Sequence, residues 1–206
     1  MSGYPQIPSR QENLPAYRID TGDLQAVRKI KGALLNLLAL TFRPETEQLI
    51  ILCIGTDRST GDALGPLAGS RLKLLRPRNA IIFGTLEEPV HAVNLAETSA
   101  TIRACHPSPY IIAIDACLGK TESVGCVDIG AGPALPGAGV NKALPAVGNV
   151  YINGVVNVGG FLEYFVLQNT RLSLVVRMAE TISRGLYFAL QNLPGPEIRY
   201  PTKAAR

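Results

Sequence analysis

Three short apolar runs stand in the middle of the chain, at residues 49–54, 80–84 and 110–114. Each run is too short for a helix and rich in isoleucine, which is typical of strands buried on both faces of a parallel sheet. Helical patterns fill the two intervals, at residues 64–75 and 94–105. This alternation of strand and helix predicts right-handed crossovers and a doubly wound α/β sheet that is mostly parallel.

The flanking segments extend this pattern. We expect a helix from Thr21 to just before Pro44, strands at residues 125–129 and 148–153, and helices at residues 159–167 and 171–190. Residues 130–145 form a long glycine- and proline-rich connection, and long ordered loops often carry function. The domain prediction is an irregular, proline-rich arm over residues 1–20, a single α/β domain over residues 21–193 and a tail over residues 194–206.

Composition narrows the classes of protein. The 206 residues are 47% hydrophobic and 17% charged, and the charged share lies below the roughly 25% of ordinary soluble domains. An ordered domain with a large core is therefore expected, and such a chain can also bury surface in a homo-oligomer. The net charge of +4 gives little reason to expect a nucleic-acid partner.

Location is predicted from the cysteines and the apolar runs. The four cysteines contain no CxxC pair, which favours free thiols in a reducing cytoplasm over a disulfide framework. Neither a secretory signal nor an apolar run near the roughly 20 residues of a membrane span is apparent. We therefore expect a cytoplasmic protein without a membrane partner.

Candidate chemistry is expected after the first three strands, because open parallel sheets bind ligands beyond the carboxyl ends of strands at a switch point. Asp62 follows the first strand in Gly61-Asp62-Ala63-Leu64-Gly65-Pro66, just where a helix begins. Taken alone, this position favours a helix cap.

Asp115 follows the buried strand at residues 110–114, where an unpaired carboxylate is costly unless something uses or neutralises it. If the first three strands are arranged in the spatial order 2-1-3, Asp62 and Asp115 face each other across one crevice. Two close carboxylates share a proton, so that one acts as an acid and the other as a base. Such a dyad can activate water against an amide carbonyl.

Other polar residues complete the predicted site. His91 is a possible third metal ligand beside the two aspartates, although a role in capping or orienting a neighbour is favoured. Asp57, Glu88 and His91 are expected at the rim, and Asn153 or Asn157 as a hydrogen-bond donor to an oxyanion. No phosphate-binding loop or GxSxG motif is present.

The residues around both aspartates resemble a known protease family. Residues 60–66 and 112–116 are similar to the germination protease of spore-forming bacteria, whose two catalytic aspartates lie in an Asp-Ala-Leu-Gly-Pro motif and at the end of an Ile-Asp-Ala strand. Residues 136–142 resemble the glycine-rich segment of that family. Residues 87–94 and the short length resemble the YyaC-type sporulation proteins. The resemblance covers most of residues 48–190. It implies a sporulation-associated peptidase with Asp62 and Asp115 as catalytic residues, a protein or peptide substrate, and a place in the cytoplasm or within the developing spore.

The wider superfamily includes the hydrogenase maturation proteases. This resemblance implies a three-layer α/β/α sandwich of the phosphorylase/hydrolase-like kind, in which a glutamate matching Asp62, an aspartate matching Asp115 and a histidine hold a metal. At the histidine position this chain reads Gly154-Val155-Val156-Asn157. We therefore expect an aspartate dyad without metal or cofactor. A metal-dependent peptidase using His91 and a non-catalytic peptide-binding or regulatory protein are the alternatives.

Overall fold

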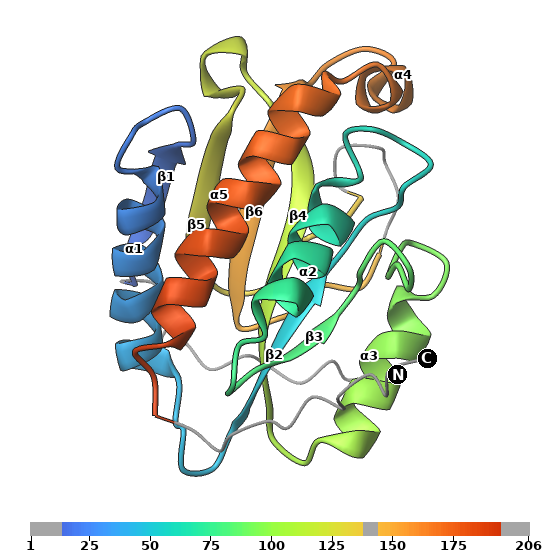
Figure 1. The fold of residues 1–206 in the computed structure, drawn as a ribbon. Helices are drawn as coiled ribbons and strands as arrows, with labels where there is room; N and C mark the ends of the chain where they lie inside the picture. Colours follow the sequence, from blue (N-terminus) through green and yellow to red (C-terminus); the bar gives the residue numbers. More distant parts are fainter. Residues whose placement is uncertain (1–13, 138–143, 195–206) are drawn as a thin grey trace, which may run out of the picture.

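The computed structural model describes residues 14–137 and 144–194. One six-stranded sheet runs through the molecule in the order β1-β5-β6-β4-β2-β3 (Figure 1). The strands β2, β3, β4 and β6 are parallel, whereas β5 and β1 are antiparallel to their neighbours. The strands are β1 (Ala16–Asp20), β2 (Gln48–Cys53), β3 (Ile81–Phe83), β4 (Pro109–Gly119), β5 (Cys126–Ala131) and β6 (Val150–Val158). The helices are α1 (Ala26–Thr41), α2 (Leu64–Leu75), α3 (Leu95–Cys105), the short 3-10 helix η1 (Thr121–Ser123), α4 (Glu163–Gln168) and α5 (Leu172–Leu190).

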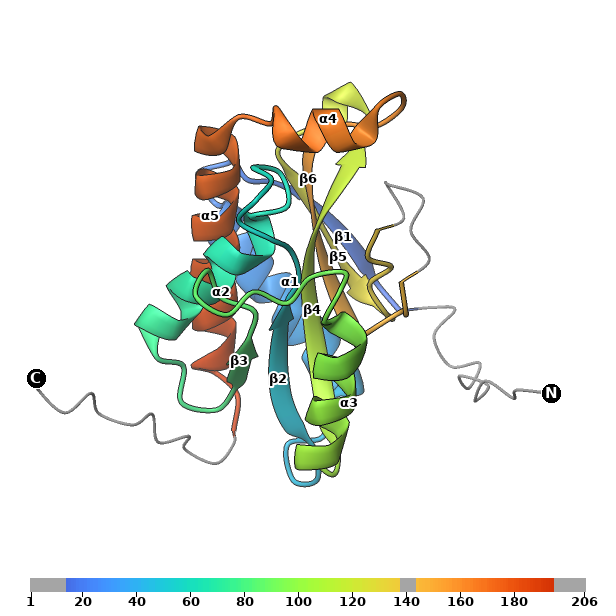
Figure 2. The same ribbon diagram turned by 90° about the vertical axis from the view of Figure 1, so that its right-hand side faces the viewer.

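The elements form three layers, as Figure 2 shows edge-on. Helices α1, α2 and α5 cover one face and share the larger core with alternate residues of the strands. Of the described helices, only α3 packs on the other face, where Leu95 and Ile102 meet the apolar residues of β2 and β4. The predicted α/β class with a mostly parallel sheet and three layers is confirmed. The half of this second face formed by β6, β5 and β1 has no described helix over it.

The predicted order of the first three strands is also confirmed. The parallel strands 80–84, 49–54 and 110–114 correspond to β3, β2 and β4, and β2 lies between the other two. The isoleucine-rich runs of β2 and β4 are buried because helices cover both faces of this part of the sheet, whereas the edge strand β3 is only partly buried. The switch point therefore lies where β2 ends beside β4.

The composition of residues 1–20 predicts an irregular arm, and this prediction is wrong for residues 16–20. These residues form β1, which pairs antiparallel with β5. Ile19 is buried in the larger core and Tyr17 packs against it, whereas Arg18 points to the other face and binds Asp128. An alternation over only five residues beside prolines is a weak signal, and the pairing partner lies more than 100 residues away. Residues 1–13 and all of the predicted tail except Pro194 lie outside the described residues.

Strands β4 and β6 are longer than their apolar runs predict. They pair with each other from Ile112 and Val150 to Gly119 and Val158, beyond the point where β2 ends. Asp115 and Asn153, both expected at strand ends, therefore lie inside strands and are direct neighbours across the sheet. Asp115 still borders the switch point, because Ile114 before it pairs with Cys53, the last residue of β2.

Candidate active site

A cavity of about 290 Å³ opens at the carboxyl end of β2, beside Asp115 of β4. Its walls come from the loop between β2 and α2, the loop between β3 and α3, the loop after β5 and helix α4. The charged, histidine and hydroxyl side chains along the first two walls and β4 are those of Thr56, Arg58, Ser59, Asp62, His91 and Asp115. The two predicted catalytic aspartates thus line one crevice.

Glycines fix the position of Asp62. Gly55, with φ of +145°, lies so close to the loop that a Cβ there would be 1.9 Å from the carbonyl oxygen of Asp62. Gly61 donates its N–H to the carbonyl of Leu167 in α4 at 2.9 Å, and a Cβ at Gly61 would be 2.7 Å from the Leu167 side chain. Gly65 packs the first turn of α2 against the backbone of Ile54. The glycine spacing of the motif therefore serves close backbone packing that holds Asp62 at the end of β2.

Asp62 lies one residue before Ala63, the N-cap of α2. A side chain at this position precedes the cap instead of occupying it. The cap interpretation, favoured from the sequence when Asp62 is taken alone, is therefore not what the helix geometry shows.

The surroundings of Asp115 disfavour the ionised form of its carboxyl. The pKa of its carboxyl is raised to about 7, chiefly by burial. The hydrogen bond from the Ala116 N–H lowers this pKa, and the nearby Asp62 carboxylate raises it. That N–H donates to Oδ1 of Asp115 at 2.9 Å. At neutral pH a large fraction of Asp115 is protonated, which provides one acid beside a second carboxyl in the same crevice.

This raised pKa predicts a pH dependence of stability. Because the folded pKa lies above the unfolded value of 3.8, the contribution of Asp115 is fully present below about pH 4 and is lost as pH rises through 7. At about 1.4 kcal/mol per pH unit, the loss has an upper limit of about 4 kcal/mol. We expect the free energy of unfolding in urea to fall between pH 5 and pH 8.5, and Asp115→Asn to remove most of that fall. The same fall in the Asp115→Asn variant would show that another group causes it.

His91 lines the crevice, but its ring is tied to its own loop. Its Nδ1 accepts a hydrogen bond from the Val93 N–H at 3.3 Å, and the backbone N–H of His91 donates to Asn94 Oδ1 at 2.7 Å. Within residues 14–137 and 144–194, no three His, Cys, Asp or Glu side chains come together as a metal-binding group. The arrangement of His91, Asp62 and Asp115 therefore does not fit the metal site of the maturation-type alternative.

The other predicted site residues do not line the crevice. Asp57 and Glu88 are exposed, and Asp57 lies between Thr56 and Arg58 of the wall, so the expected place of both residues at the rim stays a prediction. Asn157 joins β6 to α4, because its Nδ2 donates to the Val166 carbonyl at 3.3 Å and to the Thr170 hydroxyl at 3.2 Å. Asn153 lines a neighbouring pocket. Neither asparagine thus lies in the aspartate crevice.

The structure adds Ser59, which sequence reasoning missed. Its side chain is 5% exposed and lines the crevice, and its Oγ has no hydrogen-bond partner among the described residues. A buried hydroxyl without a partner is uncommon and calls for an explanation. Its position in the polar loop three residues before Asp62 was the available signal.

Comparison with known proteins places the chain in a family. A family model described as "Protein of unknown function (DUF1256)" matches residues 19–185. The chain belongs to this family. A relative in Bacillus subtilis (strain 168), "Uncharacterized protein YyaC", is 49% identical over 178 residues, which cover 86% of this chain and 85% of the relative. The predicted resemblance to YyaC-type proteins is confirmed, and both aspartates lie within the part that the DUF1256 model matches.

A solved structure also shows some similarity to this DUF1256 chain. It is the crystal structure of a NiFe hydrogenase maturation protease HycI from Thermococcus kodakarensis KOD1, with a TM-score of 0.47 and 18% identity over 77% of this chain and 99% of that one.

None of the described helices is long and apolar enough to cross a membrane.

Proposed function

We propose that the protein is a peptidase that hydrolyses an amide bond of a protein or peptide with Asp62 and Asp115 as an aspartate dyad. The observation that carries the proposal is the crevice itself, which brings the carboxyl groups of Asp62, in the loop before α2, and Asp115, within β4, to one cavity. The raised pKa of Asp115 supports it, because a shared proton requires one carboxyl that stays neutral near pH 7. The resemblance of residues 60–66 and 112–116 to the germination protease is the reason for choosing amide hydrolysis.

In the proposed reaction, ionised Asp62 removes a proton from water as the water oxygen attacks the carbonyl carbon. Protonated Asp115 donates its proton to the carbonyl oxygen. The C–N bond then breaks, the nitrogen leaves with the proton held by Asp62, and a carboxylic acid and an amine are formed. The proton on the former carbonyl oxygen returns to Asp115 as that carbonyl re-forms.

Ser59 is the proposed hydrogen-bond donor to the developing oxyanion. Ser59 lines the crevice, and its buried Oγ has no partner among the described residues, so in the proposal the side chain rotates to bring this hydroxyl to bound substrate. This role replaces the one expected for Asn153 or Asn157, which point to other surroundings.

The proposed peptidase function is tested on a mixture of many peptides, so that no particular substrate has to be chosen in advance. The purified protein is incubated with a library made by digesting a denatured bacterial lysate with chymotrypsin, and new peptide ends are identified by mass spectrometry. We expect a set of new ends that the Asp62→Asn and Asp115→Asn variants do not produce. Absence of new ends with the wild-type protein, or the same ends with both variants, would reject the proposal.

The metal-dependent alternative is separated by a chelator. We expect hydrolysis of the library to persist in EDTA and to be unchanged in His91→Ala. Loss of hydrolysis in both experiments, with recovery on adding zinc or nickel, would favour the alternative. His91 lies in the crevice wall, which is the observation that makes this second candidate worth testing.

A sporulation role in the cytoplasm or developing spore is part of the proposal. The relative YyaC provides the test: a Bacillus subtilis strain lacking YyaC is complemented with this protein or with its Asp62→Asn, Asp115→Asn variant, and spore yield and germination are measured. Rescue by the wild-type protein alone supports a catalytic role. Equal rescue by both supports a non-catalytic binding protein, and no defect in the deletion strain rejects the sporulation role.

A further inference from the structure

A row of polar side chains crosses four strands of the open sheet face. Asp115 of β4 pairs with Asn153 of β6, Asn153 pairs with Asp128 of β5, and Asp128 pairs with Arg18 of β1. Residues paired directly in a sheet present their side chains on the same face. The row therefore leads from the catalytic crevice to the far edge of the sheet.

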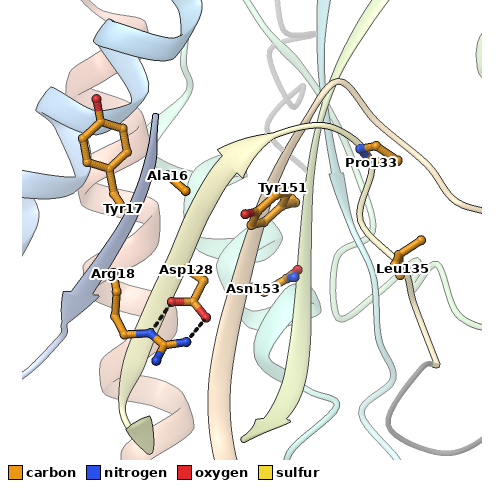
Figure 3. Close-up of a pocket in the computed structure, with 8 residues that line it drawn as sticks. All are labelled: Ala16, Tyr17, Arg18, Asp128, Pro133, Leu135, Tyr151 and Asn153. Atoms are coloured by element: carbon orange, nitrogen blue, oxygen red, sulfur yellow. Dashed lines mark hydrogen bonds and ion pairs between the residues drawn. The ribbon is translucent and has the colours of Figure 1, made fainter. Parts of the chain in front are cut away.

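A second pocket lies along this row, with a volume of about 510 Å³ (Figure 3). Arg18, Asp128 and Asn153 line its polar part, and Tyr151, Pro133 and Leu135 line its apolar part. The Tyr151 phenol lies over Gly130, where a Cβ would be 2.4 Å from its hydroxyl oxygen. Glycine at residue 130 thus leaves room for the ring against the sheet.

One segment borders both cavities. Pro133 and Leu135 line the second pocket, and the next residues, Pro136 and Gly137, line the crevice. Asn153 in the second pocket is the direct strand neighbour of Asp115 in the crevice. The two cavities are therefore adjacent parts of one face.

The polar groups of the second pocket match an amide. The Arg18 guanidinium donates from Nε and Nη2 to the two Asp128 oxygens at 2.6 and 2.7 Å (Figure 3). Its Nη1 donates to Ser123 Oγ at 3.1 Å. The charges of Arg18 and Asp128 cancel in this ion pair. An ionised ligand would therefore have to compete with one of the two side chains for its partner. The Asn153 amide has no hydrogen-bond partner among the described residues and offers both a donor and an acceptor. A peptide group, with one N–H and one C=O, can bond to Asn153 and to the remaining N–H groups of Arg18 and lone pairs of Asp128 without breaking the ion pair.

We propose that the second pocket is a substrate-binding subsite that holds the main chain of an extended peptide whose scissile bond lies at Asp62 and Asp115. The inference rests on the proposed peptidase function. Three strand spacings separate β4 from β1, or about 14 Å, which an extended peptide covers in about four residues. The substrate is thus an unfolded segment or tail, bound several residues from the cleaved bond, and short amides lack this contact.

The test compares two lengths of one peptide. One peptide that the wild-type protein cleaves in the lysate library is synthesised in full. Two shortened forms are also made: one keeps only two residues before the cleaved bond, and the other keeps only two residues after it. The variant is Arg18→Gln with Asp128→Asn. The matched control is Lys29→Gln with Asp23→Asn, because this ion pair is also partly exposed but lies on and before α1.

We expect the Arg18→Gln, Asp128→Asn variant to raise KM for the full peptide about tenfold with kcat within about twofold, a size suited to one or two lost hydrogen bonds. The difference from wild type disappears for the form that is shortened on the side of the pocket. The control keeps wild-type kinetics on every peptide.

Two results would overturn the inference while the catalytic pair stands. Unchanged KM for the full peptide means that the pocket does not bind substrate, and an equal loss on all three peptides means that the substitutions disturb the crevice itself. If the wild-type protein cleaves no peptide in the library, the proposed function fails, and the subsite fails with it.

Discussion

Asparagine in place of Asp115 is expected to lower kcat/KM for a cleaved peptide by about a thousandfold, the size of a lost general acid or base. Asparagine keeps the shape of the side chain but cannot donate the proton that Asp115 holds near neutral pH. Asp62→Asn is expected to have an effect of the same size, because the base is then lost. The double variant should be no slower than the slower single variant, because the two carboxyls act as one unit. The measurement is steady-state hydrolysis of one synthetic peptide chosen from the library.

The control for charge is Glu180→Gln. Glu180 lies exposed on α5, away from the crevice wall, and its replacement removes the same formal charge. We expect its kcat/KM to match wild type. A loss of less than about tenfold in Asp115→Asn would contradict general acid catalysis by this residue, and additive losses in the double variant would show that the aspartates act independently.

The central part of the fold was predictable because its signal is local. Continuous apolar runs identify β2, β3 and β4 without any knowledge of their partners. The rule that ligands bind at the switch point of such a sheet then brings Asp62 and Asp115 to one place. The structure agrees, with Ile114 paired to Cys53 at the end of β2 and both aspartates in the wall of the crevice.

The rest depended on pairing between distant segments. β1 is an edge strand held by β5, and Arg18 has its partner Asp128 110 residues away. The length of β4 past Asp115 is set by pairing with β6, which the three apolar residues at 116–118 are too few to indicate. Asn153 was predicted near the oxyanion because its strand was expected to end there. The same pairing instead places it in the row toward Arg18.

Ser59 could not be predicted as a site residue for a third reason. Its residue type in a polar loop is common, and its burial is visible only in the folded structure. Burial, and not the presence of a serine, is what makes its free hydroxyl noteworthy.

Gly55→Ala is expected to have the second large effect. Its φ of +145° is rarely adopted by residues with a side chain, and the new Cβ would be 1.9 Å from the Asp62 carbonyl oxygen and 2.9 Å from Pro66 Cδ. Both neighbours belong to the motif that starts α2, so the loop must move. We expect a loss of about 3 kcal/mol or more in the free energy of unfolding, as for other strained backbone substitutions.

The same movement displaces Asp62, and a shift of about 1 Å in a catalytic group costs about a hundredfold in rate. Gly55→Ala should therefore lose hydrolysis at temperatures well below its midpoint of thermal unfolding, where the chain is still folded. Gly32→Ala is the matched control, since Gly32 is exposed in α1 with no atom within 4 Å of a new Cβ. Alanine there should stabilise the helix by about 0.5–1 kcal/mol and leave hydrolysis intact. Equal stability and equal hydrolysis in Gly55→Ala and Gly32→Ala would show that close packing of Gly55 against Asp62 does not hold the site, and the dyad would then need another anchor.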